Sequence, residues 1–148
     1  KEITFIQDID IVDYNELRKL VHWIPVSEKR ASRALRNTFF KKVAVCDGKV
    51  VGMGRVVSDG GSTYLITDVM VRPEYQSSHI GASLIEYLMQ AIQEDVEEGE
   101  TITVHLMAAY EKEGFYRRFG FHTRPFGNHG CGMTMWVSRI DDGTIMLS

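Results

Sequence analysis

Residues 63–99 place an apolar strand, a short polar loop and a long amphipathic helix next to one another. The β-branched run ends at Arg72-Pro73, and the polar residues 76–79 separate it from a helix that should begin near Ile80. The first four N–H groups of a helix have no partner within the helix, so they point at whatever lies beyond its N-terminus. This order of elements therefore predicts a binding site for a phosphate or pyrophosphate group of a cofactor.

The length and charge of the chain limit what else it can be. A chain of 148 residues suits one domain with one core, and we expect a single domain over residues 1–148. No apolar run approaches the ~20 residues of a membrane-spanning helix, so we expect no membrane partner. The net charge of −3, without a Lys/Arg-rich stripe, argues against nucleic acid as a partner.

The cysteines and histidines indicate neither a disulfide framework nor a metal centre. Cys46 falls in an apolar strand and Cys131 in a Gly-rich loop, which favours a reducing, cytoplasmic location. The first residues also lack the features of a signal peptide. The five histidines show no Cys/His spacing typical of zinc, so we expect no metal.

Hydrophobic periodicity and turn residues predict the remaining elements. Asp8 or Asp10 is expected to cap a first helix and Ser27 a second one. Asp47-Gly48 is a strong hairpin signal. We expect strands at residues 3–6, 43–46, 49–57, 63–71 and 101–107, a sixth starting at 121–123 and a seventh at 133–137, with helices at 12–23, 28–39, 80–98 and 111–119.

These elements define the expected fold class. The strand, helix and strand over residues 63–107 form a βαβ unit, so the two strands should be parallel neighbours. Gly52 and Gly54 alternate within one strand, which predicts a bulge or a close backbone approach. We expect an α+β fold, an α/β sandwich with a mixed, mostly antiparallel seven-stranded sheet flanked by about four helices.

Two segments resemble a known family. Residues 76–81 read Gln-Ser-Ser-His-Ile-Gly, and residues 114–121 read Gly-Phe-Tyr-Arg-Arg-Phe-Gly-Phe. The first is similar to the pyrophosphate loop, Gln/Arg-x-x-Gly-x-Gly/Ala, of the GNAT superfamily of acetyl-CoA-dependent N-acetyltransferases, and the second to its Phe-Tyr-x-x-x-Gly-Phe segment. The resemblance covers about residues 41–137. One departure is His79, which stands where the family usually has a Gly that permits unusual φ values.

The resemblance implies acetyl-CoA as cosubstrate and assigns its binding residues. Backbone groups near Val69 and Val71 would pair with the pantetheine, and an N–H near Val69 or Met70 would polarise the thioester carbonyl. The N–H groups of residues 78–82 would hold the pyrophosphate. The simpler interpretation makes residues 76–78 a helix cap and the two valines core. The expected cofactor-binding residues are Val69, Met70, Val71, Gln76, Ser77, Ser78, His79, Ile80, Gly81 and Ala82.

The resemblance also implies two catalytic residues. Tyr116 stands at the family position that protonates the departing thiolate of CoA, or it is simply a half-buried aromatic. Asp68 is the one acid in its strand and would serve as general base or amine anchor. It could equally cap a backbone group or pair with an Arg. Glu28 and Glu113 are weaker candidates for the base.

The function implied is N-acetyltransfer from acetyl-CoA to a primary amine of a small molecule, by direct attack in a ternary complex. Trp23, Tyr64 and Phe126 are candidates for the wall of the acceptor pocket, or they are core residues. Two alternatives stay open: a peptide or protein N-acetyltransferase, and a non-catalytic CoA-sensing regulatory module. The expected partner is a small-molecule amine, and dimers are common in the family, so a homodimer is one expected assembly.

Overall fold

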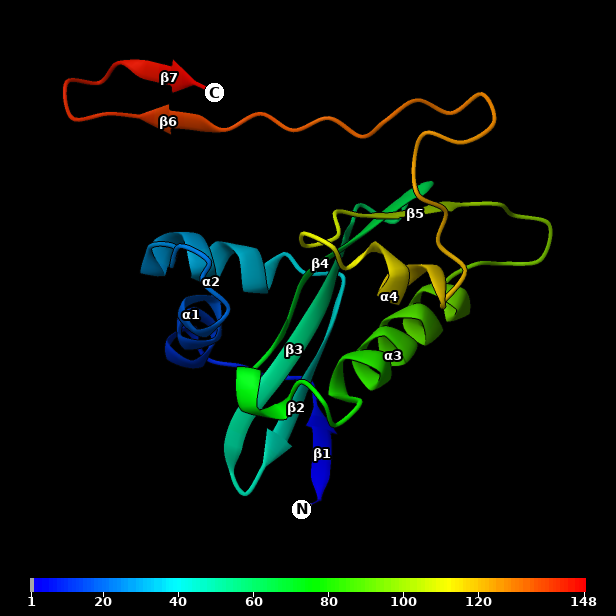
Figure 1. The fold of residues 1–148 in the computed structure, drawn as a ribbon, viewed down its shortest axis with the longest axis horizontal. Helices are drawn as coiled ribbons and strands as arrows, with labels where there is room; N and C mark the ends of the chain where they lie inside the picture. The colour runs from blue at the N-terminus through cyan, green and yellow to red at the C-terminus, as the bar shows by residue number, and fades with distance from the viewer. Residues whose placement is uncertain (1) are drawn as a thin grey trace. The chain divides into compact units, whose positions relative to one another are not determined.

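A computed structural model describes residues 2–148, which divide into one compact unit that ends at Met107 and a second from Ala108 to Ser148. The first unit is built on a five-stranded sheet with the strand order β1-β2-β3-β4-β5 (Figure 1). β4 and β5 are parallel and all other neighbours antiparallel, as predicted. The strands are β1 (Ile3–Ile6), β2 (Phe40–Cys46), β3 (Lys49–Ser58), β4 (Thr63–Val71) and β5 (Thr103–Leu106).

Three helices cover the two faces of this sheet (Figure 1): α1 (Ile11–Leu20) and α2 (Glu28–Arg36) one face, and α3 (Ile80–Glu94) the other. The predicted caps are confirmed, because Asp10 and Ser27 accept hydrogen bonds from backbone N–H groups in the first turns of α1 and α2. All three helices end earlier than expected. α3 ends at Glu94, four residues before the expected end at residue 98.

Alternating side chains of the strands build a core on each face, as the pleat of a strand requires. Towards α1 and α2, the buried cluster consists of Tyr14, Leu17, Ala31, Val43, Met53 and Met70. Towards α3, it consists of Ala44, Cys46, Val51, Val71, Ile80 and Leu84. Because Met70 is buried in the first cluster and Val71 in the second, the end of β4 is anchored on both faces of the sheet.

A bulge interrupts the pairing of β3 with β4. Met53 opposes Met70 and Arg55 opposes Thr67, so two residues, Asp68 and Val69, face Gly54 alone. Asp68 has a φ of 54°, in the left-handed region that non-Gly residues rarely adopt. β5 pairs with β4 only as far as Ile66, so among the described residues the rest of β4 has a strand partner on one edge only. This part of β4 contains Val69 and Val71, whose backbone groups the resemblance assigns to the pantetheine.

The close backbone approach predicted for Gly52 and Gly54 is also confirmed. A Cβ added to Gly52 would lie 2.9 Å from the backbone O of Met70, and one added to Gly54 would lie 2.9 Å from Cδ1 of Leu88. The two contacts differ, because a strand carbonyl cannot move without breaking the sheet whereas the end of a leucine side chain can rotate.

We expect Gly52→Ala to lower the free energy of unfolding by about 2 kcal/mol and Gly54→Ala by about 1 kcal/mol, since overpacking is relieved most easily at a flexible side chain. Urea unfolding of the two variants tests this order. Adding Leu88→Ala should make the Gly54 substitution nearly neutral and leave the Gly52 substitution unchanged. Equal losses for the two glycines would contradict the argument.

The second unit contains the short helix α4 (Glu113–Arg117) and an antiparallel pair, β6 (Val137–Arg139) and β7 (Ile145–Leu147). The expectation of one seven-stranded sheet is therefore wrong: the described strands form one sheet of five and one of two. Residues 121–123 form no strand, because β-propensity alone does not supply a hydrogen-bonded partner. The strand expected from residue 133 begins only at Val137.

A turn signal that we did not use explains the second sheet. Ile140 N–H donates to Thr144 O at 2.9 Å, and Gly143 has a φ of 86° inside this turn. Asp142-Gly143 is the dipeptide that favours such a hairpin. It would have predicted the β7 strand, which lies directly after it.

Candidate functional site

The loop between β4 and α3 holds itself in place with its own polar side chains. It begins with a 3₁₀ turn, η1 (Pro73–Tyr75). The Gln76 amide then donates to Val71 O at 3.0 Å, and the Ser78 hydroxyl donates to Tyr75 O at 2.6 Å. No side chain caps α3. Residues 76–78 are therefore not the helix cap of the simpler interpretation.

The N-terminus of α3 presents unpaired backbone donors. The hydrogen bond from Ser83 N–H to His79 O, at 3.1 Å, is the first of the helix, so the N–H groups of residues 79–82 have no acceptor within the described chain. The Ser78 N–H, which we also expected as a donor, is instead bonded to Tyr75 O at 3.2 Å. Four unpaired donors and the positive end of the helix dipole form a site that can bind a pyrophosphate.

His79 adopts the backbone conformation that a glycine would supply. Its φ of 63° and ψ of 16° are left-handed, and its side chain is exposed. A non-Gly residue pays about 1–2 kcal/mol for this conformation, and His tolerates it better than most residues do. The departure from the family pattern at this position therefore leaves the direction of the donors unchanged.

We expect His79→Val to lower the free energy of unfolding by ~1–2 kcal/mol and His79→Gly to raise it by up to ~1 kcal/mol, because strain rather than contacts dominates at this position. Urea unfolding measures both changes. His22, with a φ of 67° in a turn away from the α3 N-terminus, is the matched control. His22→Gly should change stability in the same direction. A destabilised His79→Gly variant would show that the side chain makes contacts that outweigh the strain.

Arg72 is buried at the start of this loop. Its Nε donates to Val50 O at 2.6 Å and its Nη2 to Glu16 Oε2 at 2.5 Å. The side chain therefore ties the end of β4 to β3 and α1.

Asp68 lies at the centre of a buried cluster under α1. Its Oδ2 accepts hydrogen bonds from the Tyr14 hydroxyl at 2.6 Å and Arg55 Nε at 2.7 Å, and its Oδ1 accepts one from Arg18 Nη1 at 3.1 Å. Burial and the bond to Asp68 raise the pKa of Tyr14, so that phenol stays a donor. Of the alternatives for Asp68, the structure shows pairing with Arg. Two positively charged partners stabilise the ionised carboxylate and make it a weak base.

Tyr116 lies on α4, in the second unit. It is half-buried and packs edge-on against the rings of Phe115 and Phe121, with centroid distances of 5.0 and 6.2 Å. Burial raises the pKa of its phenol, so the group is protonated at neutral pH and able to donate a proton. The two weaker base candidates, Glu28 and Glu113, are exposed in the first turns of α2 and α4.

The aromatic residues proposed for the acceptor pocket belong to different parts of the chain. Trp23 is half-buried beside α1, with the Arg18 guanidinium 5.7 Å from its ring centroid. Phe126 is 40% exposed and belongs to the second unit. Tyr64 is a core residue, at 2% exposure, at the opposite end of β4 from the loop.

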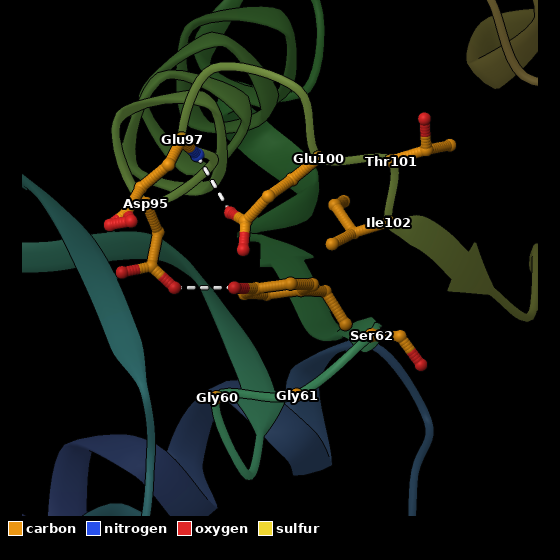
Figure 2. Close-up of a pocket in the computed structure, with 9 residues that line it drawn as sticks. Gly60, Gly61, Ser62, Asp95, Glu97, Glu100, Thr101 and Ile102 are labelled. Carbon is orange, nitrogen blue, oxygen red and sulfur yellow. Dashed lines mark hydrogen bonds between the residues drawn. The ribbon is translucent and has the colours of Figure 1, made fainter.

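Tyr64 lines an open, acidic cavity of about 440 Å³ (Figure 2). Its hydroxyl donates to the Asp95 carboxylate, and this hydrogen bond is the main cause that raises the pKa of Tyr64 to about 12. Glu97 and Glu100 complete the acidic wall, and the Glu100 carboxylate accepts from the Glu97 N–H at 2.8 Å. This cavity is separate from the loop and from Asp68.

Residues 2–148 contain neither a cluster of metal ligands nor a helix that could span a membrane. No three His, Cys, Asp or Glu side chains lie together in a way that could hold a metal ion. None of the described helices is both long and apolar enough to cross a bilayer.

Residues 36–123 match the family model described as "Acetyltransferase (GNAT) domain". The uncharacterized N-acetyltransferase ycf52 of Pyropia yezoensis is 29% identical over 90% of this chain and 75% of its own. Histone acetyltransferase TAP1 of Glycine max is 30% identical over 83% of this chain, which spans only 56% of that protein. Among solved structures, a probable acetyltransferase of Staphylococcus aureus has a TM-score of 0.80 and 29% identity, covering 90% of this chain and 98% of that one.

Proposed function

Because the chain belongs to the GNAT acetyltransferase family, we propose that it transfers the acetyl group of acetyl-CoA to a primary amine of a small molecule. The amine would attack the thioester directly in a ternary complex, and CoA would leave as a thiol. The observation that carries the proposal is the uncapped N-terminus of α3, where four N–H groups are unpaired after the left-handed His79. A pyrophosphate is the anion that such a site fits best.

The residues present fit the cosubstrate. Acetyl-CoA supplies an acetyl group activated as a thioester. The N–H groups of residues 79–82 would hold its pyrophosphate, while Gln76 and Ser78 keep the loop closed. The backbone of residues 69–71 would bind the pantetheine arm, since Met70 and Val71 are anchored in the two cores and this part of β4 has a strand partner on one edge only.

The two expected catalytic residues receive different roles. We propose Tyr116 as the general acid that protonates the leaving thiolate, since its phenol is protonated at neutral pH. Asp68 is proposed as a positioning residue, because both of its oxygens hold other side chains. It fixes the bulge that it forms with Val69, where an N–H near Val69 or Met70 would polarise the thioester carbonyl.

A reducing compartment such as the cytoplasm suits this proposal. Both cysteines are free thiols, Cys46 in the core and Cys131 exposed. An exposed thiol persists where glutathione and thioredoxin keep cysteines reduced.

Titration calorimetry with acetyl-CoA, followed by assays of thiol release with a panel of amines, tests the proposal. We expect saturable binding and amine-dependent release of CoA. Gly81→Asp places a carboxylate among the free donors and should weaken binding at least ~10-fold, because it repels the pyrophosphate. Absence of binding heat from the natural sequence would overturn the proposal. Binding without turnover on any amine would favour the CoA-sensing alternative.

A peptide or protein N-acetyltransferase is the second candidate. The acidic wall formed by Asp95, Glu97 and Glu100 would attract a Lys-rich segment, and one relative is named a histone acetyltransferase. Lysine-rich peptides in the same assay separate the two candidates. A kcat/KM for such peptides that exceeds the values for all small amines would favour the protein substrate.

A further inference from the structure

The two arginines that hold Asp68 use only part of their hydrogen-bonding capacity. Arg18 donates through Nε to Ile24 O at 2.8 Å and through Nη1 to Asp68, while Arg55 donates through Nε to Asp68 and through Nη1 to Thr38 Oγ1 at 3.3 Å. The Nη2 of each arginine has no acceptor among the described residues. No fully buried side-chain nitrogen or oxygen there lacks a partner, so both Nη2 atoms reach solvent.

The cluster carries an uncompensated positive charge. Two guanidinium groups share one carboxylate, and Glu16 on α1 is paired with Arg72. The side chains of Arg18 and Arg55 are only 18% and 13% exposed. A net charge of +1 that is largely shielded from water attracts an anion more strongly than the same charge on an open surface does.

The arginines are also held rigidly. The Arg18 guanidinium lies over the rings of Tyr14 and Trp23, at 5.8 and 5.7 Å from their centroids, and the hydroxyl of Thr38 holds Arg55 from the other side. An incoming oxyanion would therefore meet donors that need no reorganisation. Planar guanidinium groups fixed in this way suit carboxylate and phosphate oxygens.

We propose that Arg18 and Arg55 form an oxyanion site for a carboxylate or phosphate group of the acceptor, so that the acceptors are amines that also carry an anionic group. This rests on the proposed function, because it places the acceptor beside the Asp68 bulge, next to the β4 backbone that would hold the thioester. A simple ammonium ion would be repelled by the cluster. An acceptor with its own anion balances the charge, and the positive field favours the neutral, attacking form of its amine.

Anion binding is testable without any acetyl transfer. Trp23 and Trp136 are the only tryptophans, so Trp136→Phe leaves Trp23, beside Arg18, as the single reporter. Titration with inorganic phosphate, and separately with acetate, should change its emission saturably. The change should disappear in Arg18→Met and persist in Arg33→Met, an exposed position on α2. If Arg18→Met does not fold, Arg18→Lys keeps the charge but lacks Nη2, and should bind at least ~10-fold more weakly.

Matched acceptors test the consequence for turnover. We expect kcat/KM to be at least ~10-fold higher for phosphoethanolamine than for ethanolamine, or for β-alanine than for propylamine, and the preferred pair tells phosphate from carboxylate. Arg55→Lys should remove the preference. Equal turnover of the charged and the uncharged amine in both pairs would overturn the oxyanion site and leave the proposed acetyltransferase activity standing. Phosphate binding without acetyl-CoA binding would instead overturn the proposed function, and with it the acceptor role, while the anion site itself would stand. No anion response in the natural sequence would overturn the site.

Discussion

Asp68→Asn is expected to lower the free energy of unfolding by about 3 kcal/mol, because the buried carboxylate holds two arginines. The variant keeps the shape of the side chain and the tolerance of the left-handed φ, so the change isolates the charge. Removing one partner of a buried ion pair costs ~3–5 kcal/mol, and the partial exposure of both arginines places this case at the lower end. Urea unfolding at neutral pH gives the value.

Tyr14→Phe is the matched control for this prediction. It removes the hydrogen bond to Asp68 at 2.6 Å and leaves both ion pairs, so we expect a loss of about 1 kcal/mol. An Asp68→Asn variant as stable as Tyr14→Phe would show that the ion pairs contribute little. Asp68→Asn also separates a positioning role of Asp68 from a role as the catalytic base. A positioning role predicts a lower kcat with an unshifted pH profile, whereas loss of a base would remove the limb that reports its ionisation.

Tyr116→Phe is expected to lower kcat by ~10²-fold while leaving the Kd for acetyl-CoA unchanged, because a general acid acts in the transition state and contributes little to ground-state binding. Burial raises the pKa of Tyr116 above its ordinary value near ~10. The acid form is therefore retained through pH 9, and activity lost by ionising this phenol should appear only at higher pH. Steady-state kinetics combined with calorimetry measure both quantities.

Tyr110 provides the control in the same unit. It is 88% exposed, so Tyr110→Phe should leave kcat and the Kd unchanged. Unaltered turnover in Tyr116→Phe would remove the acid assignment and leave protonation of the thiolate to solvent. A parallel rise in the Kd would show that Tyr116 packs against the cosubstrate rather than protonating its product.

The elements that the sequence predicted best are those whose signals are local. Residues 63–71 and 80–94 form the expected strand and helix because a period of two and a period of 3.6 each bury one face. The Asp47-Gly48 hairpin formed because its turn residues accept positive φ values without help from the rest of the chain. The strand predicted to start at residues 121–123 does not form, for the opposite reason: a strand exists only where another strand pairs with it.

The amino-acid order by itself thus determined the strand, loop and helix that expose four N–H groups, because those preferences act between residues close in the chain. Only the tertiary structure decided the surroundings of Asp68. Tyr14, Arg18 and Arg55 reach it from positions 54, 50 and 13 residues away. No periodicity links residues so far apart in the chain. Packing α1 against the bulged β4 brought Arg18 to the carboxylate that Arg55 reaches from β3, and that excess charge is what now suggests the chemistry of the acceptor.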